Sequence, residues 1–535
     1  SSYYTDIKSD EKFIDLEILP NLEFKVVSAN SLIELDDKEV SLISLTWDKN
    51  ELIKNMGAYF NASYGNKNII RGEILRLIKE YSNHNAKLEN YNPFDMLRSY
   101  DFFDSGLMFG VDKFDLVIMN PPYFQLTGNH QYLHYFDKKD SKVADIYQLF
   151  MEMAFIKLID EGGIVSAVIS NKWMRAGYGE RTRKFLYNKA YVFEIIDLGA
   201  NWFESATVDT NIITYGKRKA EVQDKINSYK ISLCDDIIKA KKEKVSSGEK
   251  ECFIYPKKDN SSWIILNEDE RSILEKIHKF KPLNDWDITI NYGIKTGFNE
   301  AFIIDEATKE RLIKEDSKSA EIIKPLLRGR DIKRYCYDFN NLYLINVHNG
   351  LKHENIEPIN VDNYPAVKKH LDKYSNKLQK RADKGDTFYN LRDCAYLEDF
   401  RKEKIIWKEM GNSPAFIYDK ESYYTNDTCR IMVGNHLIFL LSIFNSKCWD
   451  FIFKKFYSGG GLGNDGFRYK SEFMLDTPIP EPYEDTENKL VNLVDDIIRL
   501  KKNNKDSSDI EAEVDKIVYS LYNLTDEEIR VIEGE

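Results

Sequence analysis

The chain is predicted to be an α/β protein, followed by a mixed α+β region and a helical tail. Three observations support this fold class. Short β-rich apolar runs alternate with segments of helical spacing over residues 114–215, short strands and glycine turns fill residues 263–482, and helical periodicity returns over residues 488–532. Alternating strands and helices are typical of a parallel sheet covered by helices.

The first part of the chain is expected to contain a short strand and a helical insert. Residues 22–35 begin with alternating apolar residues and indicate a strand that runs into a loop. Residues 48–89 carry Leu52, Met56, Ile74 and Ile78 at helical spacing, which predicts an antiparallel helical pair. We therefore expect a helical insert at about 48–95.

The sheet elements follow in order. Residues 114–119 form an apolar strand that Pro121 and Pro122 must end, because proline cannot donate to a sheet ladder. The later patterns predict a helix over 145–158, a turn at 161–163, a strand over 164–169, a helix over 181–187, and strands over 192–197 and 211–215. This order favours a parallel sheet.

The remaining boundaries come from changes in composition. Residues 217–258 are polar and rich in lysine, which predicts a linker at 221–262 between a first domain at 1–220 and a second at 263–482. The tail, 483–535, is expected to form two helices split near 503–509, with Leu490, Val494, Val514 and Val518 among their apolar positions.

Composition narrows the class of protein. The 535 residues carry 76 basic and 88 acidic side chains, a net charge of -12, and 42% are hydrophobic, which excludes wholesale disorder. The apolar run at 437–444 is far shorter than the roughly 20 residues of a membrane span. Six scattered cysteines without a Cys-x-x-Cys pair argue against disulfides or a metal site and fit the cytoplasm. The acidic balance weighs mildly against a nucleic-acid partner but leaves room for a local basic surface.

The string that carries chemistry is Asn120-Pro121-Pro122-Tyr123, directly after the strand at 114–119. An asparagine oxygen and the following proline carbonyl supply two acceptors on a rigid turn, and such acceptors can hold the two N–H groups of an exocyclic amine. The tyrosine ring offers a face for stacking a base. The alternative is a plain strand-terminating turn.

This string resembles the catalytic motif of amino-group DNA adenine methyltransferases. Beyond it, the chain resembles the methyltransferase and target-recognition portion of the type IIG restriction-modification enzymes, which are bifunctional type II enzymes. The similarity runs through four further strings, at residues 19–32, 109–115, 292–302 and 324–332. It implies a Rossmann-like methyltransferase sheet in residues 1–220 and a target-recognition domain in 263–482.

The resemblance also implies roles for individual residues. Asn120, Pro121, Pro122 and Tyr123 would hold and stack a flipped adenine, and Phe203 would cover the other face of that base. Asn30 would lie near the adenine of the cofactor S-adenosylmethionine, and Asn120 would also contribute to cofactor binding. Two alternatives stay open: Phe203 as a core residue beside Trp202, and Asn30 as a loop residue with a local backbone hydrogen bond.

The chain departs from the family pattern before Asn30. The family's glycine-rich cofactor loop and the acidic residue that ends its second strand have no match there, so we expect the first strands of the sheet to be missing. We also expect an N-terminal nuclease and cofactor-binding segment outside these residues. Glu487-Asn488-Lys489 has a nuclease-like spacing but lies outside any expected strand, so we dismiss it.

Basic residues in the second region suggest a surface that binds DNA. Five of them fall within eleven residues: Lys324, Arg328, Arg330, Lys333 and Arg334. Arg468 and Lys470 follow a run with five glycines in eight positions, which allows close approach of a partner. Arginine and lysine contact phosphates, and arginine also recognises guanine edges. The alternatives are a solvated charge run and a flexible surface loop.

The predicted function is that of a site-specific DNA adenine-N6 methyltransferase belonging to a type II restriction-modification enzyme. It would use S-adenosylmethionine and double-stranded DNA, without a membrane or a metal. One alternative is a DNA-recognition module that is inactive alone because the cofactor-binding and nuclease parts are absent. Another is a methyltransferase of protein or RNA, because amide and amine substrates can use similar Asn-Pro-Pro turns.

Overall fold

The structure is a computed structural model that describes residues 26–35, 49–82, 86–95, 97–126, 145–199, 202, 208–218, 224–247, 251–256, 261–351, 354–458 and 466–534. The chain divides into two compact units, Ser1–Ile265 and Leu266–Glu535.

The N-terminal unit begins with a small helical subdomain. Strand β1 (Ser28–Ala29) pairs in parallel with β2 (Ser99–Tyr100). Helices α1 (Lys49–Asn61), α2 (Tyr64–Ser82) and α3 (Ser105–Phe109) surround a shared core to which Leu52, Met56, Ile74 and Ile78 all contribute. The helical pair predicted over 48–89 is therefore confirmed.

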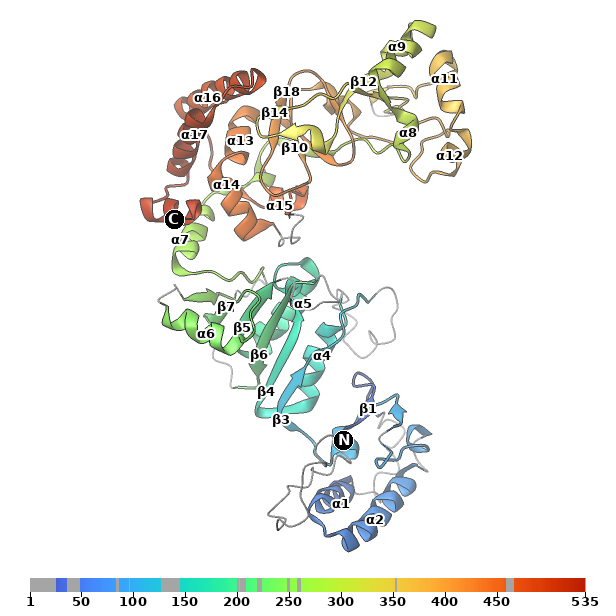
Figure 1. The fold of residues 1–535 in the computed structure, drawn as a ribbon, viewed down its shortest axis with the longest axis vertical. Coiled ribbons are helices and arrows are strands. Elements are labelled where there is room, and N and C mark those ends of the chain that lie inside the picture. The colour runs from blue at the N-terminus through green and yellow to red at the C-terminus, as the bar shows by residue number, and fades with distance from the viewer. Residues whose placement is uncertain are drawn as a thin grey trace, which may run out of the picture. The chain divides into compact units, whose positions relative to one another are not determined.

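A six-stranded sheet forms the body of this unit (Figure 1). Its strands, in spatial order, are β3 (Phe114–Met119), β4 (Ile159–Ser170), β6 (Thr210–Gly216), β5 (Tyr191–Gly199), β7 (Ile226–Lys230) and β8 (Cys252–Ile254). The strand predicted at 114–119 has the predicted bounds. Among the described strands β3 is at the edge, and its Leu116 and Ile118 are 54% and 77% exposed.

The sheet is mixed, so the expectation of a parallel sheet was wrong. Strand β4 is parallel to β3 and β5 is parallel to β7, but β6 lies antiparallel between β4 and β5. The reason is connectivity. A parallel crossover needs about a dozen or more residues, usually with a helix, and β6 starts only a short distance after β5 ends.

The predicted turn at 161–163 was also wrong. These residues belong to β4, where the register against β3 shifts between Phe114 and Leu116. Gly162 has φ of 86°, a conformation that glycine adopts readily. The extra residues form a bulge within the strand instead of ending it.

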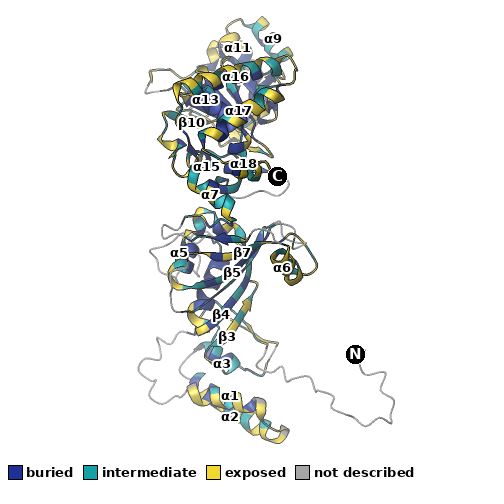
Figure 2. Cartoon of the chain, turned by 90° about the vertical axis from the view of Figure 1, so that its left-hand side faces the viewer, coloured by how far each residue is buried: buried dark blue, intermediate teal, exposed yellow. Residues whose placement is uncertain are grey.

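Helices cover both faces of the sheet. Helices α4 (Tyr147–Met153) and α5 (Glu180–Lys189) contribute Tyr147, Met151 and Leu186 to a core with Val165 and Ile195. Helix α6 (Ile237–Ser246) packs against the opposite face, which presents Ile196 and Leu198. Figure 2 shows the buried residues concentrated along the strands of this sheet.

The linker expected at 221–262 contains sheet elements instead. Strand β7 pairs with β5, and after α6 the chain returns as β8 to pair with β7. The lysines that suggested a linker lie on α6, which has no fully buried residue and an N-cap at Asp236. A polar, exposed helix at a sheet margin has the same composition as a linker.

The C-terminal unit is mixed, as predicted, and contains two four-stranded sheets. The first is antiparallel and has the order β10 (Ile288–Tyr292), β20 (Cys429–Gly434), β16 (Lys404–Lys408) and β18 (Phe416–Asp419). The second has the order β11 (Ile303–Asp305), β15 (Leu342–Ile345), β12 (Ile323–Leu327) and β19 (Tyr424–Thr425). Short pairs join β13 (Ile332–Lys333) to β14 (Cys336–Tyr337), β17 (Met410–Gly411) to β21 (Phe467–Arg468), and β9 (Lys281–Pro282) to β22 (Pro478–Ile479).

Helices complete this unit. They are α7 (Glu268–Ile277), α8 (Asn299–Phe302), α9 (Glu306–Glu315), α10 (Ser319–Ile322), α11 (Pro365–Asp372), α12 (Ser375–Lys380), α13 (Leu437–Phe444), α14 (Lys447–Ile452) and α15 (Ser471–Leu475). The tail forms α16 (Glu484–Lys502), α17 (Ser508–Leu521) and α18 (Asp526–Glu533), which is one helix more than the two predicted. The predicted apolar positions Leu490, Val494, Val514 and Val518 are buried. Within the described residues, no helix is both long enough and apolar enough to cross a bilayer.

Candidate functional site

The Asn120-Pro121-Pro122-Tyr123 motif begins directly after β3. Strands β3, β4 and β5 run in the same direction, so all three end at the same edge of the sheet. Pro121 is buried, Tyr123 is half-buried, and Asn120 and Pro122 are exposed. The motif thus presents the Asn120 amide to solvent on a turn whose two prolines donate no backbone hydrogen bond.

The side chains of Tyr123 and Asn120 are in contact. The Tyr123 hydroxyl donates to the Val168 carbonyl oxygen of β4 at 2.9 Å and lies 3.2 Å from Asn120 Oδ1. Burial raises the pKa of Tyr123 to about 12, so this hydroxyl keeps its proton at neutral pH. The phenol therefore ties the motif to the end of the neighbouring strand.

Helix α4 and the residue before it contact the motif segment. The Tyr147 ring is fully buried and meets the Tyr123 ring edge-on, with centroids 6.0 Å apart. The next residue of the motif segment, Phe124, donates its backbone N–H to Asp145 Oδ1 at 3.1 Å and accepts from Ile146 N–H at 3.1 Å. Asp145 was not predicted, although an aspartate just before a helical apolar pattern is a capping signal that could have identified it.

Other polar groups gather at the same edge of the sheet. Asn171, just after β4, donates to Asp197 Oδ1 near the end of β5 at 2.9 Å. Burial, followed by the nearby Asp197 charge, raises the pKa of Asp209, while Lys172 opposes that shift. None of these residues belongs to a recognisable local motif, so the sequence pattern does not predict them.

Two predicted site residues are not joined to the motif by the structure. Phe203 lies outside the described residues. Asn30 directly follows β1, and its Oδ1 accepts a hydrogen bond from Leu32 N–H at 3.3 Å. This is the local backbone interaction that we kept open as the alternative, and the cofactor role of Asn30 stays a prediction.

Most of the predicted basic residues have acidic partners within the C-terminal unit. Arg328 pairs with Asp331 at 3.0 Å, Lys333 with Asp338 at 2.5 Å and Arg334 with Glu511 at 3.0 Å. Lys470 lies 3.3 Å from Glu472. The pKa of Lys324 is lowered by burial and then by the charge of Arg401. A cation held by its own acid has less to gain from a phosphate, and its role in DNA binding remains a prediction.

Arg330 and Arg468 differ from these residues. Both are exposed, and no ion pair is found for either among the described residues. Lys408 joins them. A Cβ at Gly329, the neighbour of Arg330, would lie 3.3 Å from Lys408 Cβ, and one at Gly411 would lie 2.8 Å from Lys408 Cε. Gly411 belongs to β17, whose Met410 pairs with Arg468 of β21. We call Arg330, Lys408 and Arg468 the cationic triplet.

Two family models match separate segments of the chain. Residues 31–203 match the family model of the Eco57I restriction-modification methylase, and residues 324–463 match that of the TaqI-like C-terminal specificity domain. The type II methyltransferase M.BstVI of Geobacillus stearothermophilus is 23% identical over 452 residues, which cover 78% of this chain and 75% of the relative. M.BanIII of Aneurinibacillus aneurinilyticus is 23% identical over 495 residues and 82% of each chain.

The chain is a homologue of type II methyltransferases. The resemblance predicted from the sequence is thereby confirmed. A solved structure, the type IIL restriction-modification enzyme MmeI in complex with DNA, shares the fold at a TM-score of 0.53 and 11% identity. The alignment covers 86% of this chain and 62% of MmeI, so the chain spans less than two thirds of that enzyme.

Most of the candidate site residues of this chain lie within the two matched segments. The Asn120–Tyr123 motif falls in the methylase segment, residues 31–203, and so does Asp145. Arg330 and Lys408 fall in the specificity segment, residues 324–463, while Arg468 lies just after it. Residues 459–465, which hold most of the predicted glycine run, lie outside the described residues.

An exposed aromatic ring contacts the segment of this chain that matches the specificity domain. Tyr292 of β10 is 53% exposed, and the Arg430 guanidinium lies 4.0 Å from the centroid of its ring. Arg430 is in turn paired with Glu409, the residue after Lys408. The guanidinium of Arg430 therefore contacts both the exposed Tyr292 ring and the residue that follows Lys408.

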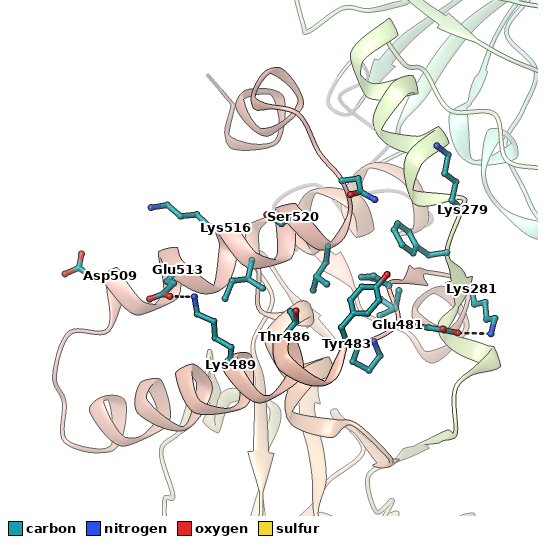
Figure 3. A pocket seen from close by; sticks show the side chains of 17 residues that line it. Lys279, Lys281, Glu481, Tyr483, Thr486, Lys489, Asp509, Glu513, Lys516 and Ser520 are labelled. Atoms are coloured by element: carbon teal, nitrogen blue, oxygen red, sulfur yellow. Dashed lines mark hydrogen bonds and ion pairs between the residues drawn. The ribbon is translucent and has the colours of Figure 1, made fainter.

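A groove of about 1070 Å³ lies in the C-terminal unit of this chain, near β22, α16 and α17 (Figure 3). Ion pairs Lys281–Glu481 and Lys489–Glu513, both at 2.7 Å, line it together with Tyr483. None of the predicted site residues lines this groove. Among the described residues, no group of His, Cys, Asp and Glu side chains could hold a metal ion.

Proposed function

We propose that this chain is the catalytic and target-recognition part of a site-specific DNA methyltransferase that modifies N6 of adenine. The single observation that carries the proposal is the geometry of the Asn120–Tyr123 motif at the end of β3. An exposed asparagine amide lies beside a tyrosine ring that is held by its hydrogen bond to the Val168 carbonyl oxygen and by its contact with Tyr147. The matches to type II methyltransferases support the same class of reaction.

The motif can prepare an adenine amine in two ways. The amide oxygen of Asn120 and the carbonyl oxygen of Pro121 accept hydrogen bonds from the two N–H groups, which leaves the nitrogen lone pair free to attack. Tyr123 offers a ring face on which an extruded base can stack, and base stacking contributes about 1–3 kcal/mol. Catalysis would then depend on positioning and would need no protein nucleophile.

S-adenosylmethionine, when bound, would supply the methyl group, while Asn120 and Pro121 hold the amine that accepts it. The described residues provide only part of a site for this cofactor. Asn30 is engaged with Leu32 N–H, and β3 is an edge strand with exposed Leu116 and Ile118. An exposed apolar edge strand is normally covered, so we propose that β3 packs against further residues that complete the cofactor site.

We propose that sequence recognition depends on the C-terminal unit. The cationic triplet would contact phosphates, and Tyr292 would stack on or wedge against a base. The location would be the cytoplasm.

The proposal is tested by methyl transfer from labelled S-adenosylmethionine to double-stranded DNA of mixed sequence. We expect the label to appear as N6-methyladenine and to vanish in Asn120→Ala. Label in RNA or protein but not in DNA would contradict the proposal. DNA binding without any label would favour the alternative, in which the chain recognises DNA but lacks its cofactor-binding part.

A further inference from the structure

Asp145 occupies a special position in the N-terminal unit. It lies just before α4, and its side chain faces the segment that follows the catalytic motif. The two prolines of the motif have no N–H groups, so Asn120-Pro121-Pro122 cannot be held by backbone donation at those two positions. Phe124 N–H is therefore among the first donors after the prolines that can fix the turn, and its acceptor is Asp145 Oδ1 at 3.1 Å.

The connection is reciprocal. Phe124 accepts from Ile146 N–H at 3.1 Å, and Gln125 forms an isolated antiparallel bridge with Asp145. Backbone N–H groups of Ile146 and Tyr147 also point to the Asp145 carboxylate. One carboxylate thus joins the start of α4 to the backbone that carries Tyr123.

Asp145 is itself held by a buried polar side chain. Its backbone N–H donates to Gln148 Oε1 at 3.2 Å, and Gln148 Nε2 donates to Thr182 Oγ1 at 2.7 Å and to the Tyr178 carbonyl oxygen at 3.1 Å. Gln148 is 1% exposed. Because buried polar groups must be satisfied, these bonds leave Gln148 little freedom and fix Asp145 against α5.

We propose that Asp145 is a positioning residue, whose carboxylate fixes the backbone of Phe124 and thereby the relative placement of Tyr123 and Asn120. The inference rests on the proposed function, methyl transfer at the Asn120–Tyr123 motif. Asp145 acts through Phe124 and does not itself touch the base. Its hydrogen bond is charge-assisted, and such bonds are stronger than neutral ones.

The charge of Asp145 is sensitive to pH near neutrality. Burial raises its pKa from the ordinary 3.8 to about 6, against the opposing effects of its backbone hydrogen bonds and of Lys172. The other titratable groups that face it are the phenols of Tyr123, Tyr147 and Tyr178, which remain neutral in this range. As the pH falls through about 6, the carboxylate gains a proton and its bond to Phe124 N–H weakens.

The effect on folding has the opposite sign. The folded pKa lies above the unfolded value, so the folded state binds more protons between about pH 6 and 4, and this group adds stability as the pH falls through that window. If methyl transfer falls below pH 6 because Asp145 gains a proton, that protonation does not also destabilise the fold.

Two variants and one control test the inference on the full chain. We expect Asp145→Ala to lower kcat for methyl transfer at least tenfold, with KM for DNA within threefold. Asp145→Asn should be intermediate and should lose the acid limb near pH 6. Asp236→Ala is the matched control, because Asp236 also accepts a backbone N–H bond at the start of a helix, from Lys239 at 2.9 Å. It should leave kcat unchanged.

Hydrogen exchange gives a readout that does not require activity. In Asp145→Ala the amides of residues 123–126 should exchange at least tenfold faster than in the wild type, and in Asp236→Ala they should not. Unchanged exchange in Asp145→Ala, or an unchanged kcat in an active enzyme, would overturn the inference. If the wild type transfers no methyl group to DNA but exchange rises as expected, the proposed function fails while the positioning contact stands.

Discussion

The hydroxyl of Tyr123 lies between the Val168 carbonyl oxygen, at 2.9 Å, and Asn120 Oδ1, at 3.2 Å. A phenol has one proton and can donate it fully to one acceptor, and the shorter contact is with Val168. The Asn120 side chain is therefore held less tightly than Tyr123 and can turn toward a substrate amine. This relationship makes the asparagine the adjustable member of the pair and the tyrosine the anchored one.

Asn120→Ala should abolish methyl transfer without loss of fold. The side chain is exposed, so its removal should shift the thermal midpoint little. Removal of one preorganised polar group from a transition state typically costs about 100-fold or more in rate. Labelled methyl transfer and a DNA-binding isotherm check this, and the dissociation constant should stay within a few-fold. A variant that loses DNA binding or folding instead would contradict the catalytic assignment.

Tyr123→Phe should separate the hydroxyl from the ring. The ring remains available for stacking, but the bond to Val168 is lost, and one such bond contributes about 0.5–1.5 kcal/mol. If that energy holds the motif in its reactive geometry, kcat should fall between about twofold and tenfold. Tyr123→Ala, which also removes the ring, should lose considerably more activity. Equal losses in both variants would show that the ring face contributes nothing.

The cationic triplet should determine the salt dependence of DNA binding. Each phosphate contact adds about 0.9 to the slope of log affinity against log salt concentration. We therefore expect Arg330→Gln, Lys408→Gln and Arg468→Gln each to reduce that slope by about 0.9. Arg334→Gln is the control, since Arg334 is paired with Glu511. If the slope falls only in Arg334→Gln, the ion-paired residues contact the phosphates and the cationic triplet does not.

Lys404 and Asp419 should determine the stability of the C-terminal unit. Both side chains are 0% exposed and their charged atoms lie 2.6 Å apart, on facing positions of β16 and β18. Lys404→Met strands a buried carboxylate, so the free energy of unfolding should fall by about 3–5 kcal/mol. Urea unfolding followed by tryptophan fluorescence measures this. Arg311→Met, which breaks the exposed Arg311–Glu315 pair, should cost no more than about 0.5 kcal/mol.

Local patterns predicted local features well. The strand over 114–119 ends where Pro121 and Pro122 remove backbone donors, and the helical pair and the tail follow directly from apolar spacing. The antiparallel direction of β6 was missed, although the short connection between the strands predicted at 192–197 and 211–215 leaves no room for a crossover helix. The polar character of α6 hid a helix at the margin of the sheet.

Site contacts between residues close together in the sequence could be predicted, and contacts between distant residues could not. The pairing of Arg328 with Asp331 is visible at a spacing of three residues, whereas the pairing of Arg334 with Glu511 joins residues far apart in the chain. Lys408 is one of 76 basic residues and belongs to no motif, so only the fold places it beside Gly329 and Gly411. The role proposed for Asp145 depends on its hydrogen bond with Phe124 N–H, which the sequence does not show.

The three members of the cationic triplet come from separate parts of the chain, near residues 330, 408 and 468. An exchange of one short gene segment between relatives would therefore split the set and leave an incomplete surface. We expect such an exchange to weaken binding to DNA of any sequence, because phosphate contacts carry no sequence information. Inheritance of the whole C-terminal unit would keep the three residues together.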